Sequence, residues 1–261
     1  MKSFVLFIGL FSALFTLPAA AVDPAVRWQQ PEFILQAFKE VALRNEYSLQ
    51  GRMVRRWNKP IRVWLDHQVP DAEVHTSLVN MHLKHLSEIT GLSIKTVSRK
   101  QDANLIMVFT KQSLWKRQVG ELFGKRAEKI VHGAVCMANF RVNGRYEIDQ
   151  AAVIIPVDQA RMHGKLVTCI VEEITQVMGL PNDSEKVYPS IFNDRTPETL
   201  LSGLDYLLLK LLYQPVLKPG MTEEQALPLL KKVISEWQSD GTIQSAQKIV
   251  KRGELYPLLG Y

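Results

Sequence analysis

Hydrophobic and polar positions along the chain follow two periods, one typical of helices and one typical of strands. Alternating or continuous apolar runs predict strands over residues 53–67, 92–97, 103–109, 132–141 and 146–157. Helical spacing predicts helices over residues 31–44, 71–90, 111–123, 158–178, 200–213 and 222–237. Asn143-Gly144 suits a tight hairpin turn, which makes the last two strands antiparallel. The expected fold class is α/β or α+β with a mixed sheet.

Several helix ends carry their own signals. Gly91 and Gly124 are expected to end the helices that precede them, and Asp158 is expected to cap the long helix that reaches Met178. Thr222-Glu-Glu-Gln225 matches a capping box. Residues 180–196 are rich in Pro, Asn, Asp and Ser and are expected to form a loop.

The first 21 residues are typical of a secretory signal peptide. A single charge at Lys2 is followed by an apolar run and by Ala19-Ala20-Ala21, which suits cleavage after Ala21. The run is too short to span a bilayer, and no later stretch is a transmembrane candidate. We therefore expect a periplasmic or secreted protein.

Beyond the signal peptide, the pattern suggests three parts. Residues 22–57 are expected to form an N-terminal helical arm, residues 58–180 a lobe of sheet and helices, and residues 181–261 an irregular and helical C-terminal lobe. About 240 residues suit one sizeable domain or two closely packed lobes. Oligomeric state is not indicated.

The two cysteines, Cys136 and Cys169, favour one disulfide. An even pair, far apart in sequence in an exported chain, is most simply a single bridge, although two separate buried thiols are the alternative. No histidine cluster or further cysteine near them completes a metal site.

Charge adds little to the functional picture. The whole chain carries a net charge of +6, and without Lys2 it has 31 basic and 26 acidic residues. Basic residues gather within residues 52–62 and 111–129, but apolar positions interrupt both groups. Ordinary solvated faces explain them better than an anionic partner does, and we expect no nucleic acid partner.

Three histidines lie on the expected helix over residues 71–90. His75, His82 and His85 fall within or beside its apolar arc, and His82 and His85 have a spacing that could clasp a metal. Because no other ligand is signalled nearby, we interpret them as histidines at the margin of a core face.

The strongest candidate for chemistry is the helix that stops at Gly179. Glu172 and Gln176 are four residues apart and share one face, whereas Glu173 projects about a hundred degrees away. The segment before them, residues 166–171, is uncharged, so the two acids are placed in a helix that otherwise belongs in a core. A buried carboxylate must be paired, bound to metal or protonated.

Glu172-Glu173-x-x-Gln176-x-x-Gly179-x-x-Asn182 resembles the metzincin zinc-peptidase motif, His-Glu-x-x-His-x-x-Gly-x-x-His. The resemblance implies a mixed sheet before the motif helix, a small irregular lobe after it, and Glu173 as general base. The segment Ser190-Ile-Phe-Asn193 resembles the Met-turn region that follows in this family.

All three zinc-ligand positions of that motif are changed in this chain. Glu172 and Gln176 replace the helix histidines, and Asn182 replaces the third. One carboxylate with two neutral amides is a poor zinc site, so we expect no zinc and no resident cofactor. With Asp183, these oxygens would better suit a hard cation such as calcium or magnesium.

A wider pattern resembles an uncharacterised family of exported proteobacterial proteins known only as a domain of unknown function. It is carried by Cys169 through Asp183, Ser190-Ile-Phe-Asn-Asp194, and residues 212–221. The family resemblance implies no established activity.

Three functions are therefore weighed. The first is a pseudo-peptidase that has lost zinc and binds a peptide or an envelope polymer. The second is a zinc-independent hydrolase, with Glu173 as general base and Gln176 or Asn182 as the donor that positions water or an oxyanion. The third is a structural protein in which Glu172, Glu173, Gln176 and Asn182 form a buried polar network. We expect the first.

Overall fold

The computed structural model describes residues 24–44, 52–129, 133–193, 195 and 198–261, so the expected signal peptide lies outside the described residues. Within them, six strands form one sheet: β1 (Arg56–Trp57), β2 (Ile61–His67), β3 (Ile94–Thr96), β4 (Leu105–Thr110), β5 (Met137–Val142) and β6 (Glu147–Pro156). The α-helices are α1 (Pro31–Phe38), α2 (Ala72–Thr90), α3 (Gln112–Phe123), α4 (Val157–Met162), α5 (Leu166–Gln176), α6 (Gly203–Leu212), α7 (Glu223–Ser239), α8 (Thr242–Val250) and α9 (Leu255–Leu258). Shorter helical turns are η1 (Pro24–Gln29), the π-helix η2 (Lys39–Leu43), η3 (Lys100–Asp102) and η4 (Ala127–Lys129).

The sheet is mixed, which confirms the expected fold class. Its order is β1-β6-β4-β2-β3, and all of these pairings are parallel. β5 pairs antiparallel with β6 through the hairpin that contains Asn143-Gly144. Ala151 of β6 pairs with both Leu105 of β4 and Phe140 of β5, so β4 and β5 lie on opposite edges of β6.

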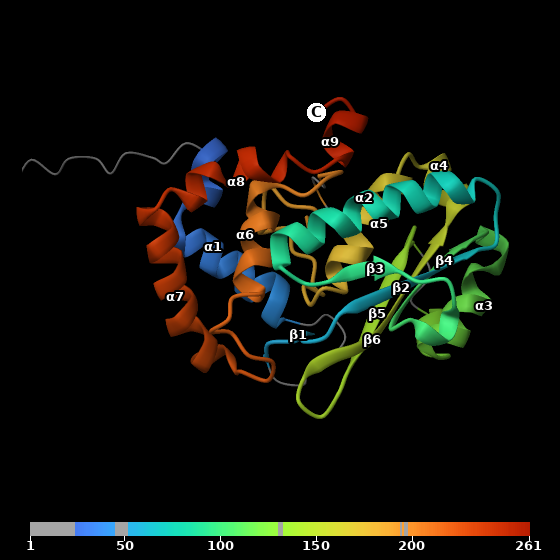
Figure 1. Cartoon of the computed structure of the whole chain (residues 1–261), viewed down its shortest axis with the longest axis horizontal. Helices are drawn as coiled ribbons and strands as arrows, with labels where there is room; N and C mark the ends of the chain where they lie inside the picture. The colour runs from blue at the N-terminus through green and yellow to red at the C-terminus, as the bar shows by residue number, and fades with distance from the viewer. Residues whose placement is uncertain (1–23, 45–51, 130–132, 194, 196–197) are drawn as a thin grey trace, which may run out of the picture.

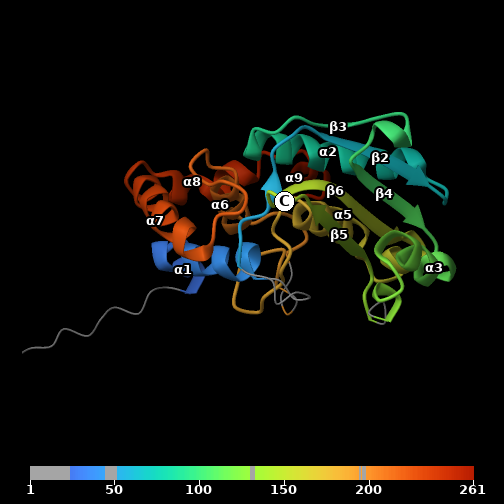
Figure 2. The ribbon, with the colours of Figure 1, turned by 90° about the horizontal axis from the view of Figure 1, so that it is seen from below.

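Helices cover both faces of the sheet because its buried strands are apolar on both sides. Val63, Met107 and Val153 point into the main core together with residues of α2 and α5. The alternate positions Val108 and Ile154 pack against α3, where Trp115 and Val119 meet them. In Figure 2, α3 and α2 accordingly lie on opposite sides of the strands.

A group of helices formed by α1, α6, α7 and α8 stands beside one end of the sheet (Figure 1). The leucine-rich α6 is at its centre, and its apolar side chains are buried nearly all round, as the continuous apolar run predicts. The Thr222–Gln225 capping box at the start of α7 is confirmed. Helices α8 and α9 extend beyond the last helix that the sequence pattern predicts.

The expected long helix over residues 158–178 is wrong in one respect: it is two helices, α4 and α5. The break lies at Gly164, which has a φ of 65°, a left-handed value that glycine adopts readily. Asp158 does not cap α4. Its Oδ1 instead accepts hydrogen bonds from the backbone of Gln112, the first residue of α3, at 2.8 Å, and from Gln159 at 3.0 Å. Asp158 therefore caps the neighbouring helix.

The three histidines of α2 are buried, in agreement with their interpretation as core-face residues. His82 Nε2 lies 3.0 Å from the hydroxyl of Thr175 on α5. Burial lowers the pKa of His82 to about 3 and that of His85 to about 4. Both rings are therefore neutral parts of the packing at ordinary pH.

Arg56, which belongs to the basic group within residues 52–62, stabilises the fold instead of lying on a solvated face. Arg56 Nη1 donates to the carbonyl oxygens of Leu212, Gln214 and Leu217 at 2.8 to 3.1 Å, and the guanidinium lies over the ring of Tyr213. It therefore satisfies carbonyl groups at and beyond the C-terminal end of α6, which have no partner inside the helix.

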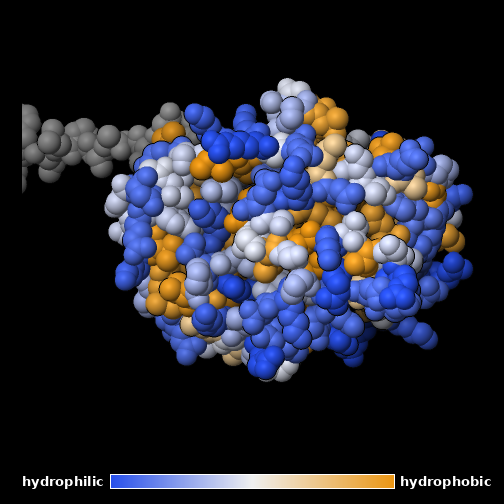
Figure 3. Space-filling model, in the orientation of Figure 1, coloured by the Kyte–Doolittle hydropathy of each residue, from blue (hydrophilic) through white to orange (hydrophobic). Residues whose placement is uncertain are grey.

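The face of the molecule in Figure 3 is largely hydrophilic, with separate hydrophobic areas. The large apolar side chains that are most exposed in the described chain include Met162 and Val74. None of the helices within the described residues combines the length and apolar character needed to cross a bilayer.

Candidate functional site

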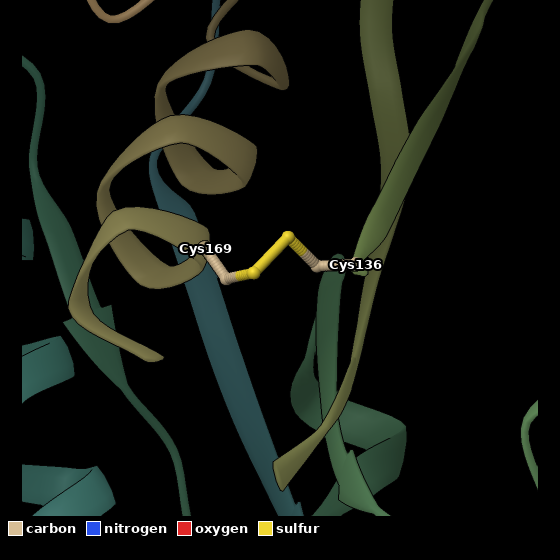
Figure 4. Close-up of a disulfide and its surroundings, with 2 residues drawn as sticks. All are labelled: Cys136 and Cys169. Carbon is tan, nitrogen blue, oxygen red and sulfur yellow. A yellow bond between two sulfur atoms is a disulfide. The ribbon is translucent and has the colours of Figure 1, made fainter. Parts of the chain in front are cut away.

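The candidate site is built around α5, which is fastened at its start to the sheet. Cys169 in the first turns of α5 forms a disulfide with Cys136, with 5.9 Å between the two Cα atoms. Cys136 lies directly before β5, rather than within it as the pattern predicts. Figure 4 shows the bridge running from the helix to this edge of the sheet. The expected disulfide is confirmed.

The other end of α5 is held by two side chains and a glycine. Trp57 Nε1 donates to the carbonyl of Val177 at 2.7 Å, and the hydroxyl of Tyr213 donates to that of Met178 at 2.7 Å. Gly179 has a φ of 115°, and a Cβ there would lie 2.2 Å from the carbonyl oxygen of Arg55. Only glycine fits this turn, which sends the chain directly from the helix to Asn182 and Asp183.

Glu173 is buried on the inner side of α5. Glu173 is 6% exposed, and its Oε2 has no hydrogen-bond partner among the described residues. Burial raises the pKa of this carboxyl well above its ordinary value, and the negative charges of Glu172 and Asp183 raise it further. The neutral acid is therefore favoured, which is the opposite of what a general base requires.

Gln176 and Asp183 meet across the glycine turn. Gln176 Nε2 donates to Asp183 Oδ1 at 3.0 Å and to Oδ2 at 3.1 Å. Both residues are half-buried. The amide of Gln176 is thus engaged by a charged acceptor, so it is not available to donate to an oxyanion.

Asn182 points away from the other candidates and toward the N-terminal helices. Its Nδ2 donates to the carbonyl of Glu40 at 2.9 Å and to that of Asp183 at 3.0 Å, and its backbone N–H donates to Val41 at 3.2 Å. Asn182 is buried and ties the turn to η2. Its contacts are structural.

The structure thus brings together the side chains of Glu172, Glu173, Gln176 and Asp183, whereas the side chain of Asn182 bonds only to backbone carbonyls, those of Glu40 and Asp183. Within the described residues no three side chains of the histidine, cysteine, aspartate or glutamate type are arranged to hold a metal ion. The set can instead act as an acidic, half-buried surface with a neutral acid beneath it.

Strand β5 lies beside α5, and its outer edge pairs with no other strand among the described residues. β6 is its only partner among the described strands. The backbone N–H of Ala151, opposite Phe140, donates to Asn104 on the β4 side, so Phe140 and Ala151 form a pair without hydrogen bonds between them. The main-chain groups of Phe140 therefore point outward, as do those of Ala138 two residues earlier. The outward N–H of Phe140 donates to the side-chain Oδ1 of Asn139 at 2.8 Å.

One polar centre was missed by the sequence analysis. Asp205 on α6 is fully buried and accepts hydrogen bonds from Ser190 Oγ at 2.5 Å, from the Ile191 backbone at 3.1 Å and from the Ser202 backbone at 2.7 Å. Burial raises its pKa to about 6, although these bonds oppose the rise. The spacing of Ser202 and Asp205 before an apolar run is a capping-box signal that could have found it.

Residues 31–232 match the model of a family described as "Protein of unknown function (DUF2927)". The chain belongs to this family. The DUF2927 region runs from the start of α1 into α7 and so contains the sheet, the disulfide, α5 and the acidic turn. A comparison with curated proteins finds no match.

Proposed function

We propose that this DUF2927 protein is a non-catalytic, exported peptide-binding protein with a metzincin-like scaffold. An extended peptide adds as a further strand to the outer edge of β5, beside the acidic turn of α5. The observation that carries the proposal is the outer edge of β5, which pairs with no described strand and along which the main-chain groups of Ala138 and Phe140 are directed outward. The N–H of Phe140 donates to Asn139 Oδ1 at 2.8 Å, a contact that an added strand would replace. Such an edge is a template for strand addition.

The disulfide supports this assignment because it fixes the edge relative to the acidic side chains. Cys136 precedes β5 by one residue, and Cys169 precedes Glu172 by three. A peptide on β5 therefore lies against a rigid boundary, and less conformational entropy is lost on binding than with a mobile edge. The bridge also suits an oxidising compartment, in keeping with the proposed signal peptide over residues 1–21 and a periplasmic or secreted location.

The metzincin-like scaffold is supported by the order of its parts. A mixed sheet precedes the helix with Glu173, a glycine turn ends that helix, and an irregular segment with a buried apolar helix follows. The changed ligand positions argue against zinc chemistry at this place. An envelope polymer is a second ligand class for the same surface, but the outward main-chain groups favour a peptide.

Hydrolysis without zinc is less well supported. The proposed base, Glu173, is buried in a setting that favours its neutral form, and the two amides that would position water or an oxyanion are already bonded to Asp183 and to backbone carbonyls. General base catalysis needs an ionised group within reach of the substrate.

The test uses a library of random 12-residue peptides displayed on phage, selected against the disulfide-bonded protein. Recovered peptides are then titrated against wild type, Ala138→Pro and the matched control Ala138→Thr. Proline removes one outward N–H while leaving the ladder to β6 intact, so it weakens binding by roughly five- to tenfold, and threonine does not. Equal affinity for both variants, or a library that yields no binder, would contradict strand addition.

A further inference from the structure

Arg55 is a half-buried cation that lies beside β5 without a counter-ion among the described residues. Its Nη2 donates to the backbone carbonyls of Ala42 at 3.4 Å and Arg44 at 3.1 Å. Its Nε is buried without a hydrogen-bond partner in the described chain, and Nη1 makes no hydrogen bond to those residues either. Within the same part of the chain no carboxylate forms an ion pair with Arg55.

The charge of Arg55 is not compensated by the residues around it. Burial lowers the pKa of the guanidinium, and no neighbouring carboxylate raises it. Arg56, the next residue, shows the contrast: its Nη1 donates to three carbonyl oxygens, and the nearby Tyr213 raises its pKa. A charge that is drawn partly out of water is normally paired. Arg55 therefore retains the capacity to bind an anion.

The position of Arg55 relates it to the strand that accepts the peptide. Its Cζ lies 5.9 Å from the centre of the Phe140 ring, and Phe140 is a residue of β5 whose main-chain groups point outward. On an added strand, the residue opposite Phe140 would direct its side chain to the same face of the sheet, with roughly 5 Å between the two Cβ atoms. A long side chain at that position extends along the Phe140 ring toward the guanidinium.

We propose that Arg55 selects a carboxylate in the peptide that adds to β5, on the side chain of the residue opposite Phe140. The inference rests on the proposed peptide-binding function, and it names the ligand class: a peptide with an acidic side chain at that position. Nη1 donates to the carboxylate, while Nη2 stays with the carbonyls of Ala42 and Arg44. A carboxylate is the anion that an unmodified peptide supplies, and arginine binds it through charge-assisted hydrogen bonds.

The experiment starts from a peptide recovered by the phage selection. It is remade with capped ends in two series, one with glutamate and one with glutamine at each position in turn, so that the members of a pair differ only in charge. Affinities are measured by fluorescence anisotropy for wild type, Arg55→Gln and Arg145→Gln. Arg145 is the matched control, since it is an exposed arginine in the turn between β5 and β6 and pairs with Glu147.

At one position the glutamate peptide should bind wild type roughly tenfold more tightly than its glutamine partner. This preference should fall below about twofold in Arg55→Gln and persist in Arg145→Gln. If the two series bind wild type equally and Ala138→Pro weakens both, the carboxylate inference fails while strand addition stands.

Two further outcomes separate recognition by Arg55 from a structural role. If Arg55→Gln weakens glutamate and glutamine peptides alike, Arg55 acts only through the fold and the inference fails. If the glutamate preference survives in Arg55→Gln, Arg55 is not its cause and the inference fails as well. A selection that yields no binder contradicts both proposals.

Discussion

The side-chain amide of Gln176 donates to both carboxylate oxygens of Asp183, at 3.0 and 3.1 Å. This pair joins the end of α5 to the loop beyond Gly179 and places a carboxylate next to Glu172 and Glu173. The amide that a hydrolase would need for its oxyanion is thereby used, and the local charge becomes more negative. The same contact therefore argues against catalysis at this place.

Glu173→Gln should change how stability depends on pH. The pKa of Glu173 is raised above its ordinary value of 4.5 in the folded protein, so the unfolded chain loses this proton first as pH rises. At a pH below 4.5 the carboxyl is protonated in both the folded and the unfolded chain, so it does not change the free energy of unfolding. Between that value and the raised folded pKa, the free energy of unfolding falls by about 1.4 kcal/mol per pH unit. Glutamine does not titrate, so the free energy of unfolding of the variant does not fall with pH for this reason.

Urea unfolding of both proteins from about pH 4 to about pH 8 measures the difference. The variant should gain on wild type as pH rises through this window, and Glu185→Gln, an exposed change, should track wild type. Parallel curves for Glu173→Gln and wild type would show that the folded structure does not favour the neutral acid.

Gly179→Ala should destabilise the protein by roughly 3 kcal/mol or more, because the new Cβ overlaps the carbonyl oxygen of Arg55 and the backbone is left-handed. Gly144→Ala is a suitable comparison. A Cβ there meets nothing within 4 Å, so its effect should be small. Thermal unfolding of the two variants side by side is the measurement, and equal losses would contradict the close approach at Gly179.

Asp205→Asn should cost roughly 2–4 kcal/mol, since an amide N–H₂ would replace one of the oxygens that accept hydrogen bonds from Ser190, Ile191 and Ser202. The loop before α6 should loosen with it. Chemical denaturation gives the free energy, with the exposed substitution Glu236→Gln as control, expected within about 0.5 kcal/mol of wild type. A neutral effect of Asp205→Asn would mean that this network does not anchor the loop.

Replacing both Cys136 and Cys169 by alanine should lower the free energy of unfolding by about 3–4 kcal/mol, because the bridge closes a loop with a sequence separation of 33. Denaturation with and without a thiol reductant measures the loss. Reductant should weaken wild type to a similar extent and leave the variant unchanged. Insensitivity of wild type to reductant under denaturing conditions would exclude the bridge.

Most elements could be predicted from periodicity because their apolar faces pack on one core. The helix ending at Gly91, the hairpin at Asn143-Gly144 and the capping box at Thr222 follow local rules, and they occur as expected. The break between α4 and α5 was not foreseen, since the apolar spacing continues through Gly164. Asp158 was assigned to the wrong helix because its true partner, Gln112, is adjacent only in the folded chain.

The candidate site was only partly predictable. Spacing along one helix correctly placed Glu172 and Gln176 on the same face, and the uncharged segment before them predicted the burial of Glu173. The direction of Asn182 depended on the carbonyl groups of η2, more than a hundred residues earlier in the chain, which no local pattern reveals. The open edge of β5 likewise emerges only from the strand order.

The central claim is that an extended peptide adds to the outer edge of β5. Hydrogen–deuterium exchange of the wild-type protein, with and without a selected peptide, tests it most directly at single-amide resolution. The amide of Ala138, which points away from β6, should become strongly protected when peptide is bound. That of Phe140, which already donates to Asn139 Oδ1, should gain less protection, and those of Asn139 and Arg141, which point toward β6, should change little. Protection confined to other parts of the protein, with Ala138 and Phe140 unchanged, would contradict the account.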